Sequence, residues 1–306
     1  MSESVTERGT TMESYYGRPI VKEPVWKPEI PFYFFTGGVA GASSVLHGFA
    51  RLTRNDPLAK TALLVGAAAD VASPALLISD LGRPERFLNM LRMFKVTSPM
   101  SVGSWILFVS GGASTTAALL ELADTLRPLK WAAEAVSFVT GPPLATYTGA
   151  LIANTAIPVW SEARDELPWL FGASAAASAG AAAAIFAPLE SAGPARRAAI
   201  AGVATELGLM TAMRRRLGFV GEVYEQGEAG RYARTAKACT LAGASLLALR
   251  GRRSRAATVA GGALVLAGEL SLRWSVFKAG FQSARDPRYT VLPQKERLRS
   301  KERKGA

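Results

Sequence analysis

The sequence predicts an all-α integral membrane protein with eight transmembrane helices. Three observations lead to this prediction: eight long apolar runs, charged residues or prolines between them, and an excess of Lys and Arg in one set of loops. The chain has 306 residues, of which 49% are hydrophobic, and carries a formal net charge of +12. A basic chain typically binds nucleic acid or lies at an anionic membrane face, and the apolar runs favour the membrane.

The first four runs follow a polar, Pro-rich N-terminal tail (residues 1–30). They are 32–50, 61–78, 102–120 and 131–159. A transmembrane helix needs ~20 apolar residues to cross ~30 Å of hydrocarbon. In the first run His47 is the only ionisable residue, in the second Asp70, and in the fourth Glu134, whereas the third has none. Each run is therefore predicted to be one helix, the fourth kinked or interrupted at 141–143 (Gly-Pro-Pro).

The last four runs complete a predicted membrane domain over residues 31–277. They are 167–189, 198–213, 238–249 and 256–277. The sixth and seventh are short, so we expect flanking polar residues to extend these helices. Many positions are Ala, Gly or Ser, which lowers the mean hydropathy to +0.16 but allows close helix packing in lipid. The alternative, a soluble Ala-rich helical protein, would have to bury eight such helices in one domain.

The loops predict that both termini lie in the cytoplasm. The loops and tails on the side of the termini hold 24 Lys and Arg residues, against 11 in the loops on the other side. Basic loops remain in the cytoplasm. The basic C-terminal tail (residues 278–306) alternates charge without interleaved aromatic residues, so we predict contact with membrane lipid or a partner and no nucleic-acid binding.

Two residue counts exclude several kinds of redox centre in this chain. It contains one His and one Cys, so it cannot supply two His ligands to a haem or the Cys ligands of an iron–sulfur cluster. No catalytic or metal-binding residue is predicted.

Ionisable residues inside the predicted spans are candidates for function because a charge at membrane depth is costly. Asp70, Glu206 and Glu269 are candidate proton-relay residues, and structural pairing with a neighbouring helix is the alternative for each. Glu269 and Arg273 are four residues apart and share a helix face, which favours an ion pair. His47 is expected to be a hydrogen-bonded structural residue.

Other polar and small residues gather near the predicted cytoplasmic ends of the spans. The run 33–42 begins with Tyr33 and contains Gly37 and Gly38, small residues that let a helix or a flat ligand approach closely. Tyr147 lies in a Thr-Tyr-Thr-Gly stretch of the fourth run. The loop after the second run reads Asp-Leu-Gly-Arg-Pro-Glu-Arg-Phe (80–87) and is followed by Thr-Ser-Pro-Met-Ser (97–101). This loop supplies four candidate partner-docking residues, Asp80, Arg83, Glu85 and Arg86.

These stretches, together with Trp105, resemble the NrfD/PsrC family, the membrane subunits of polysulfide reductase-like complexes. The resemblance extends from about Tyr16 to the last helix and is strongest before Trp160. It implies two four-helix bundles and a quinone or quinol site, with no haem or metal in this subunit. It implies that Tyr147 hydrogen-bonds the quinone. A His completes the pocket in relatives, whereas this chain has Tyr33 in the corresponding stretch.

The resemblance implies a quinone-binding membrane anchor of a multi-subunit oxidoreductase. Its expected partners are a four-cluster ferredoxin-like iron–sulfur subunit and a molybdopterin catalytic subunit, and its ligand is menaquinone or ubiquinone. Tyr33, Gly37, Gly38 and Tyr147 are the quinone-binding candidates. The alternatives are a transporter or proton-translocating channel that uses the intramembrane carboxylates, and a membrane scaffold without a redox role.

Overall fold

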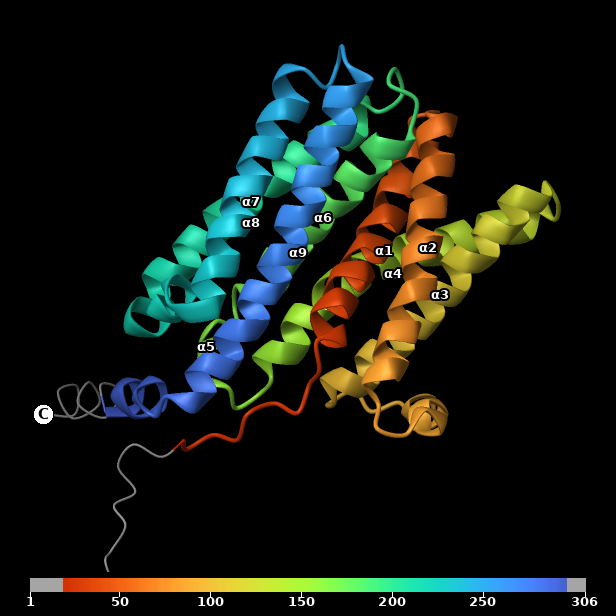
Figure 1. Cartoon of the computed structure of the whole chain (residues 1–306). Helices are drawn as coiled ribbons and strands as arrows, with labels where there is room; N and C mark the ends of the chain where they lie inside the picture. The colour runs from red at the N-terminus through yellow and green to blue at the C-terminus, as the bar shows by residue number, and fades with distance from the viewer. Residues whose placement is uncertain (1–18, 296–306) are drawn as a thin grey trace, which may run out of the picture.

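Long helices that run alternately up and down dominate the computed structural model, which describes residues 19–295 (Figure 1). No strand occurs among these residues. The long helices are α1 (Glu29–Leu52), α2 (Asp56–Asp80), α3 (Pro99–Ala123), α4 (Arg127–Ala153), α6 (Leu167–Phe186), α7 (Gly193–Leu217), α8 (Gly227–Leu249) and α9 (Arg255–Arg285). Three short elements connect them: η1 (Pro84–Leu91), α5 (Pro158–Glu162) and η2 (Gly218–Glu225). The parts of the predicted tails at 1–18 and 296–306 lie outside the described residues.

The helices define two ends of the molecule. The termini side is the end where α1 begins and α9 ends, and it carries η1, α5 and η2 (Figure 1). The short-loop side is the opposite end, where brief connections join α1 to α2, α3 to α4, α6 to α7 and α8 to α9. The functional side chains are described below by these two ends.

Each predicted apolar run corresponds to one long helix, although the fourth and fifth runs extend past the ends of α4 and α6. In the described residues, α2, α3, α6 and α9 are each long and apolar enough to cross a membrane. The two short runs are extended by polar flanks, to 25 residues in α7 and 23 in α8. That all eight helices cross the membrane, as two four-helix bundles, stays a prediction. Their packing is consistent with it, because α1–α4 contact one another, α6–α9 do likewise, and α1 and α4 meet α6 between the two sets.

Polar caps and prolines set several helix starts. The side chain of Asn55 accepts a hydrogen bond from the backbone N–H of Leu58, and Ser98 caps α3 in the same way. Ser254 caps α9 by accepting from Ala257 N–H. Such caps satisfy backbone donors that a helix start leaves unpaired, and a proline in the first turn gives up no hydrogen bond there.

Glycine and alanine bring the helix backbones into close contact. A Cβ atom on Gly41 of α1 would lie 2.5 Å from the Gly141 carbonyl oxygen of α4. A Cβ on Gly180 of α6 would lie 2.5 Å from the backbone nitrogen of Ala199 in α7. The expected role of small residues is therefore confirmed at these crossings, where no larger side chain fits.

The prediction for the two prolines of α4 was a kink or an interruption, and the interruption does not occur. The helix continues through Pro142 and Pro143. Proline removes backbone donors, and the Thr146 hydroxyl adds one further bond in this turn by donating to the Pro142 carbonyl at 2.9 Å. Packing against α1 at Gly141 also supports this part of the helix. The helix instead ends at Ala153, and the last part of the predicted run forms the separate helix α5.

One arginine of the basic cluster on the short-loop side has a structural role. The Arg255 guanidinium donates to carbonyl groups at the end of α6, including that of Ala187 at 2.6 Å. The last carbonyls of a helix lack intrahelical partners and attract cations. Arg255 thereby fastens the start of α9 to the end of α6.

Candidate functional site on the termini side

A small cavity on the termini side brings together the two tyrosines singled out in the sequence. Its volume is about 100 Å³. Its walls come from the segment before α1, the termini-side ends of four helices, and the loop that contains η1. The lining residues are Trp26, Ile30, Tyr33, Phe34, Leu77, Asp80, Leu81, Met90, Met100, Ser104, Tyr147 and Leu151.

Tyr33 and Tyr147 pack edge to face, with ring centroids 6.5 Å apart. Tyr33 is only 2% exposed. Within residues 19–295, neither phenol hydroxyl has a hydrogen-bond partner. Gly103 of α3 lies against the Tyr147 ring, because a Cβ there would be 2.1 Å from the Tyr147 Cε2 atom. The cavity therefore offers two phenol hydroxyls as hydrogen-bond donors, and the close packing of α3 at Gly103 fixes the Tyr147 ring.

The N-terminal segment (residues 19–28) covers this end of the helices. The Trp26 ring stacks on Trp160 of α5 at 5.5 Å, and the backbone N–H of Lys27 donates to the Asp80 carboxylate at 2.9 Å. Earlier in the segment, the Glu23 carboxylate accepts two hydrogen bonds from Arg285, from Nε at 2.9 Å and from Nη2 at 3.0 Å. This hydrogen-bonded cation holds the pKa of Glu23 below its ordinary value. The segment thus links the end of α2 to the end of α9.

Trp160 makes this arrangement rigid. It is fully buried, and its indole N–H donates to the Val276 carbonyl of α9 at 2.8 Å. Gly280 leaves room for the indole, since a Cβ there would lie 2.0 Å from the Trp160 Cζ2 atom. A buried Trp needs such a partner for its N–H.

The two candidate glycines of α1 face different neighbours. Gly37 lies near the Tyr33 ring and the Ser73 hydroxyl, each 4.0 Å from an added Cβ. Gly38 instead faces α6 and α9, where an added Cβ would be 3.2 Å from Arg273 Nη2. Gly37 therefore stays beside the tyrosine pair, whereas Gly38 makes room for a buried arginine.

Asp70 lies below the tyrosines, among hydroxyl groups of α1, α2 and α3. Its carboxylate accepts a hydrogen bond from Ser114, and its second oxygen is buried without a partner. One turn along α2, the Ser73 hydroxyl donates to Thr36 at 2.8 Å. Thr36 in turn donates to the Tyr33 carbonyl at 3.4 Å. These hydroxyls place polar groups at short intervals between Tyr33 and Asp70.

Glu206 and Glu269 form a second cluster, among α6, α7 and α9. Both side chains are buried, and their carboxyl groups lie within hydrogen-bonding reach of each other. Ser174 donates to Glu269 at 2.6 Å. Arg273 donates to the Phe171 carbonyl at 3.0 Å.

The expected ion pair between Glu269 and Arg273 does not form within the described part of the chain. The guanidinium lies over the Phe171 ring, 3.8 Å from its centroid, and its Nε and Nη1 atoms lack partners. The three candidate proton-relay residues therefore lie in two separate clusters. Glu206 and Glu269 lie among α6, α7 and α9, whereas Asp70 lies among α1, α2 and α3.

The candidate docking loop is exposed. No residue of η1 is buried, and Arg83, Glu85 and Arg86 all face outward. Asp80 differs from them because it lies in the cavity wall and holds the N-terminal segment. Large apolar side chains are exposed in the same loop, namely Leu88 (72%), Met93 (70%), Phe94 (59%) and Val96 (75%).

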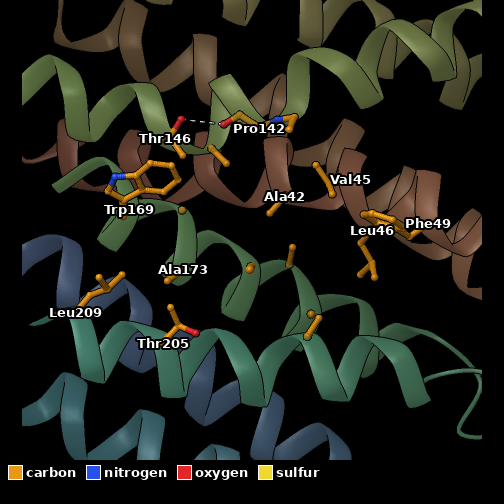
Figure 2. A pocket seen from close by; sticks show the side chains of 16 residues that line it. Ala42, Val45, Leu46, Phe49, Pro142, Thr146, Trp169, Ala173, Thr205 and Leu209 are labelled. Carbon is orange, nitrogen blue, oxygen red and sulfur yellow. Dashed lines mark hydrogen bonds between the residues drawn. The ribbon is translucent and has the colours of Figure 1, made fainter. Parts of the chain in front are cut away.

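Larger cavities lie elsewhere, toward the middle and the short-loop side. An apolar groove of about 620 Å³ runs between α1, α4, α6 and α7, with Phe49 at one end and Trp169 at the other (Figure 2). A second cavity of about 350 Å³ lies beside His47. No group of His, Cys, Asp and Glu side chains within residues 19–295 is arranged to hold a metal ion.

Sequence reasoning missed several residues of these sites. Trp26 lay in a stretch predicted to be a polar tail, although a Trp among polar residues indicates a packing contact. Thr36, Ser73 and Ser114 carry no signal in the sequence, because a hydroxyl within an apolar helix usually bonds its own backbone. Only the packing of the helices shows which of them reach another side chain.

The chain matches a protein-family model over most of its length. The model described as "Polysulphide reductase, NrfD" matches residues 20–284, nearly the whole chain. No curated protein matches the chain.

Proposed function

Because the chain belongs to the polysulphide reductase NrfD family, a family of quinone-linked membrane subunits of redox complexes, we propose that it is the quinone-binding anchor of a multi-subunit oxidoreductase. It passes electrons between a four-cluster ferredoxin-like iron–sulfur subunit and menaquinone or ubiquinone. A molybdopterin subunit performs the substrate chemistry. The observation that carries this proposal is the pair of tyrosines, Tyr33 and Tyr147, whose hydroxyls have no protein partner in the described residues beside a cavity.

The tyrosine pair suits a quinone headgroup. A quinone carbonyl accepts hydrogen bonds, and a donor stabilises the reduced form as negative charge develops on its oxygen. Tyr147 is the donor of this proposal and Tyr33 forms the adjacent wall. Gly37 lies behind it, beside the Tyr33 ring, and Gly38 is left out because it faces Arg273. The cavity of about 100 Å³ is smaller than usual ligand pockets. The exposed η1 loop therefore has to shift when a ring enters.

Protons for quinone chemistry have a route on the side of α2. Reduction of a quinone to a quinol takes up two protons and two electrons. Asp70 is the proposed proton carrier. Ser73, one turn along α2, and Thr36 are hydroxyls between it and the backbone of Tyr33, and the proposed transfer needs water molecules to complete the path to the tyrosine hydroxyls. A buried carboxyl group in this position suits proton transfer.

The η1 loop is the proposed docking surface for the iron–sulfur subunit. It presents Arg83, Glu85 and Arg86 beside exposed apolar side chains, a mixture typical of protein interfaces. It also forms one wall of the cavity through Met90. A partner seated there would lie next to the quinone. The excess of Lys and Arg in these loops favours the cytoplasm for this side.

Tyr147→Phe tests the proposal. It removes the hydroxyl and keeps the ring, so we expect quinone turnover to fall while the complex still assembles. Tyr232→Phe is the matched control, because Tyr232 stacks on Trp274 of α9, away from the cavity. Turnover should be measured on the complex purified from native membranes, together with its subunit content. Equal turnover in both variants would remove Tyr147 from the site.

Proton translocation through the second cluster is a second candidate function. It is favoured by the unpartnered buried atoms of Glu206, Glu269 and Arg273. A Glu269→Gln variant in sealed vesicles should then lose proton movement that is driven by turnover. If proton movement per turnover is unchanged, this cluster serves only to hold the helices together.

A further inference from the structure

We propose that the groove beside His47, on the short-loop side, is a second binding site that takes the ring headgroup of a quinol. It is lined by His47, Gly48, Arg51, Leu52, Trp131, Glu134, Ala135 and Phe138, and its volume of about 350 Å³ lies within the range of ligand pockets. The groove lies at the other end of α1 and α4 from the tyrosine pair. The inference rests on the proposed function for its ligand class.

The hydrogen bonds that His47 makes, and the one that it lacks, indicate what kind of group a ligand would offer. His47 is 2% exposed, and its Nδ1 atom lies 2.8 Å from the Ala59 carbonyl oxygen. A carbonyl can only accept, so Nδ1 carries a hydrogen, and in the neutral ring Nε2 is left as an acceptor. Nε2 has no hydrogen-bond partner and lies 3.5 Å from Glu134 Oε1. A protonated ring would pair with Glu134 directly, whereas in the neutral ring both atoms are acceptors and a hydroxyl donor would satisfy either one.

The charges around the groove favour a neutral ligand over a phosphate. Arg51 donates to Glu134 and to Asp56, at 3.2 Å in each case. Nearby, Lys130 pairs with Glu121 at 2.7 Å. Three carboxylates thus accompany two cations, so an anionic headgroup would meet no excess of positive charge. A ring hydroxyl, by contrast, can donate to His47 Nε2 or to the Glu134 carboxylate, both of which belong to lining residues.

Aromatic side chains fit the same ligand. Trp131, 59% exposed, and Phe138 flank the groove, and aromatic side chains at a membrane interface suit a ring with one polar edge. The Phe138 ring contacts Phe49 edge to face at 5.7 Å. Phe49 lines the end of the apolar groove between α1, α4, α6 and α7 (Figure 2). An isoprenoid tail can therefore continue from the headgroup site into that groove.

The test is a count of binding sites on the full chain in lipid nanodiscs. The probe is an alkylated hydroxyquinoline N-oxide, a fluorescent quinol analogue that is titrated by fluorescence quenching. We expect two probe molecules per wild-type chain. Ala135→Phe fills the groove and should leave one. Ala132→Phe is the matched control, because Ala132 is exposed on the same helix but does not line the groove.

Two more variants keep the two sites apart. Met100→Trp narrows the tyrosine cavity, which Met100 lines, and should remove the other probe molecule. Glu134→Gln exchanges a charged acceptor for an amide and should weaken binding at the His47 groove about tenfold. Its neighbour Arg51 keeps its bond to Asp56 in this variant.

The possible results separate the two proposals. A single probe molecule that only Ala135→Phe removes would support the His47 groove and reject the tyrosine cavity. A single molecule that only Met100→Trp removes would reject the groove. Binding that Ala132→Phe and Ala135→Phe reduce equally would also reject it. Displacement of the probe by phospholipid, mole for mole, would identify the groove as a lipid site and overturn the inference.

Discussion

Gly103→Ala is expected to slow quinone turnover by moving Tyr147. The new Cβ atom would lie 2.1 Å from Tyr147 Cε2 and 2.5 Å from Cδ2. Non-bonded carbon atoms prefer about 3.5–4.0 Å, so the ring has to retreat by about 1.4 Å. A displacement of ~1 Å in a reacting geometry can cost about 10²-fold in rate. We therefore expect turnover to fall between about tenfold and a hundredfold.

The assay compares two alanine variants of the same helix. Gly112→Ala is the control, because an added Cβ there meets no atom within 4 Å. Turnover of a soluble short-chain quinone by the purified complex should fall for Gly103→Ala only. Thermal unfolding is measured in parallel, since overpacking costs about 1–3 kcal/mol. Equal turnover in the two variants would show that the position of the Tyr147 ring does not matter to the chemistry.

Three further predictions concern stability and closure of the site. Ser114→Ala leaves both oxygens of the buried Asp70 carboxylate without a partner. It should lower the free energy of unfolding by denaturing detergent by about 1 kcal/mol, and an unchanged unfolding midpoint would contradict this. Gly41→Val should prevent α1 from packing on α4, because even a Cβ atom would lie 2.5 Å from a backbone oxygen of α4. Loss of the folded protein on size-exclusion chromatography would confirm this prediction. Arg285 holds the pKa of Glu23 below its ordinary value of 4.5, so the contribution of this ion pair to stability is complete above that pH and is lost as the pH falls through the lowered pKa. Hydrogen exchange in residues 19–28, corrected for its intrinsic pH dependence, should then rise in acid for the wild type but not for Glu23→Gln, and parallel curves would refute it.

The sequence allowed the long helices to be predicted because each of them contains most of one apolar run. The ends were less predictable. Polar residues extend α7 and α8 beyond their apolar runs, because a helix continues as long as its backbone bonds are made. The effect of Pro142 was misjudged, since support from a neighbouring helix does not appear in a local pattern.

The candidate site was predictable only in part. Tyr33 and Tyr147 meet as the family resemblance implies, and Asp70 lies near them. Gly38 could not be assigned correctly from its neighbours in the sequence, because it faces Arg273, a residue more than two hundred positions away. The pairing of helices decides such contacts, and periodicity within one helix carries no information on that pairing.

The N-terminal segment has a consequence for how the protein matures during synthesis. Arg285 follows its partner Glu23 by 262 residues along the chain, so it leaves the ribosome long after Glu23. Domains form as the chain emerges, N-terminal parts first, so α1–α4 can assemble while Trp26 still lacks its stacking partner Trp160. The N-terminal segment, which contributes Trp26 to the cavity wall, therefore has its full set of contacts only when α9 is in place.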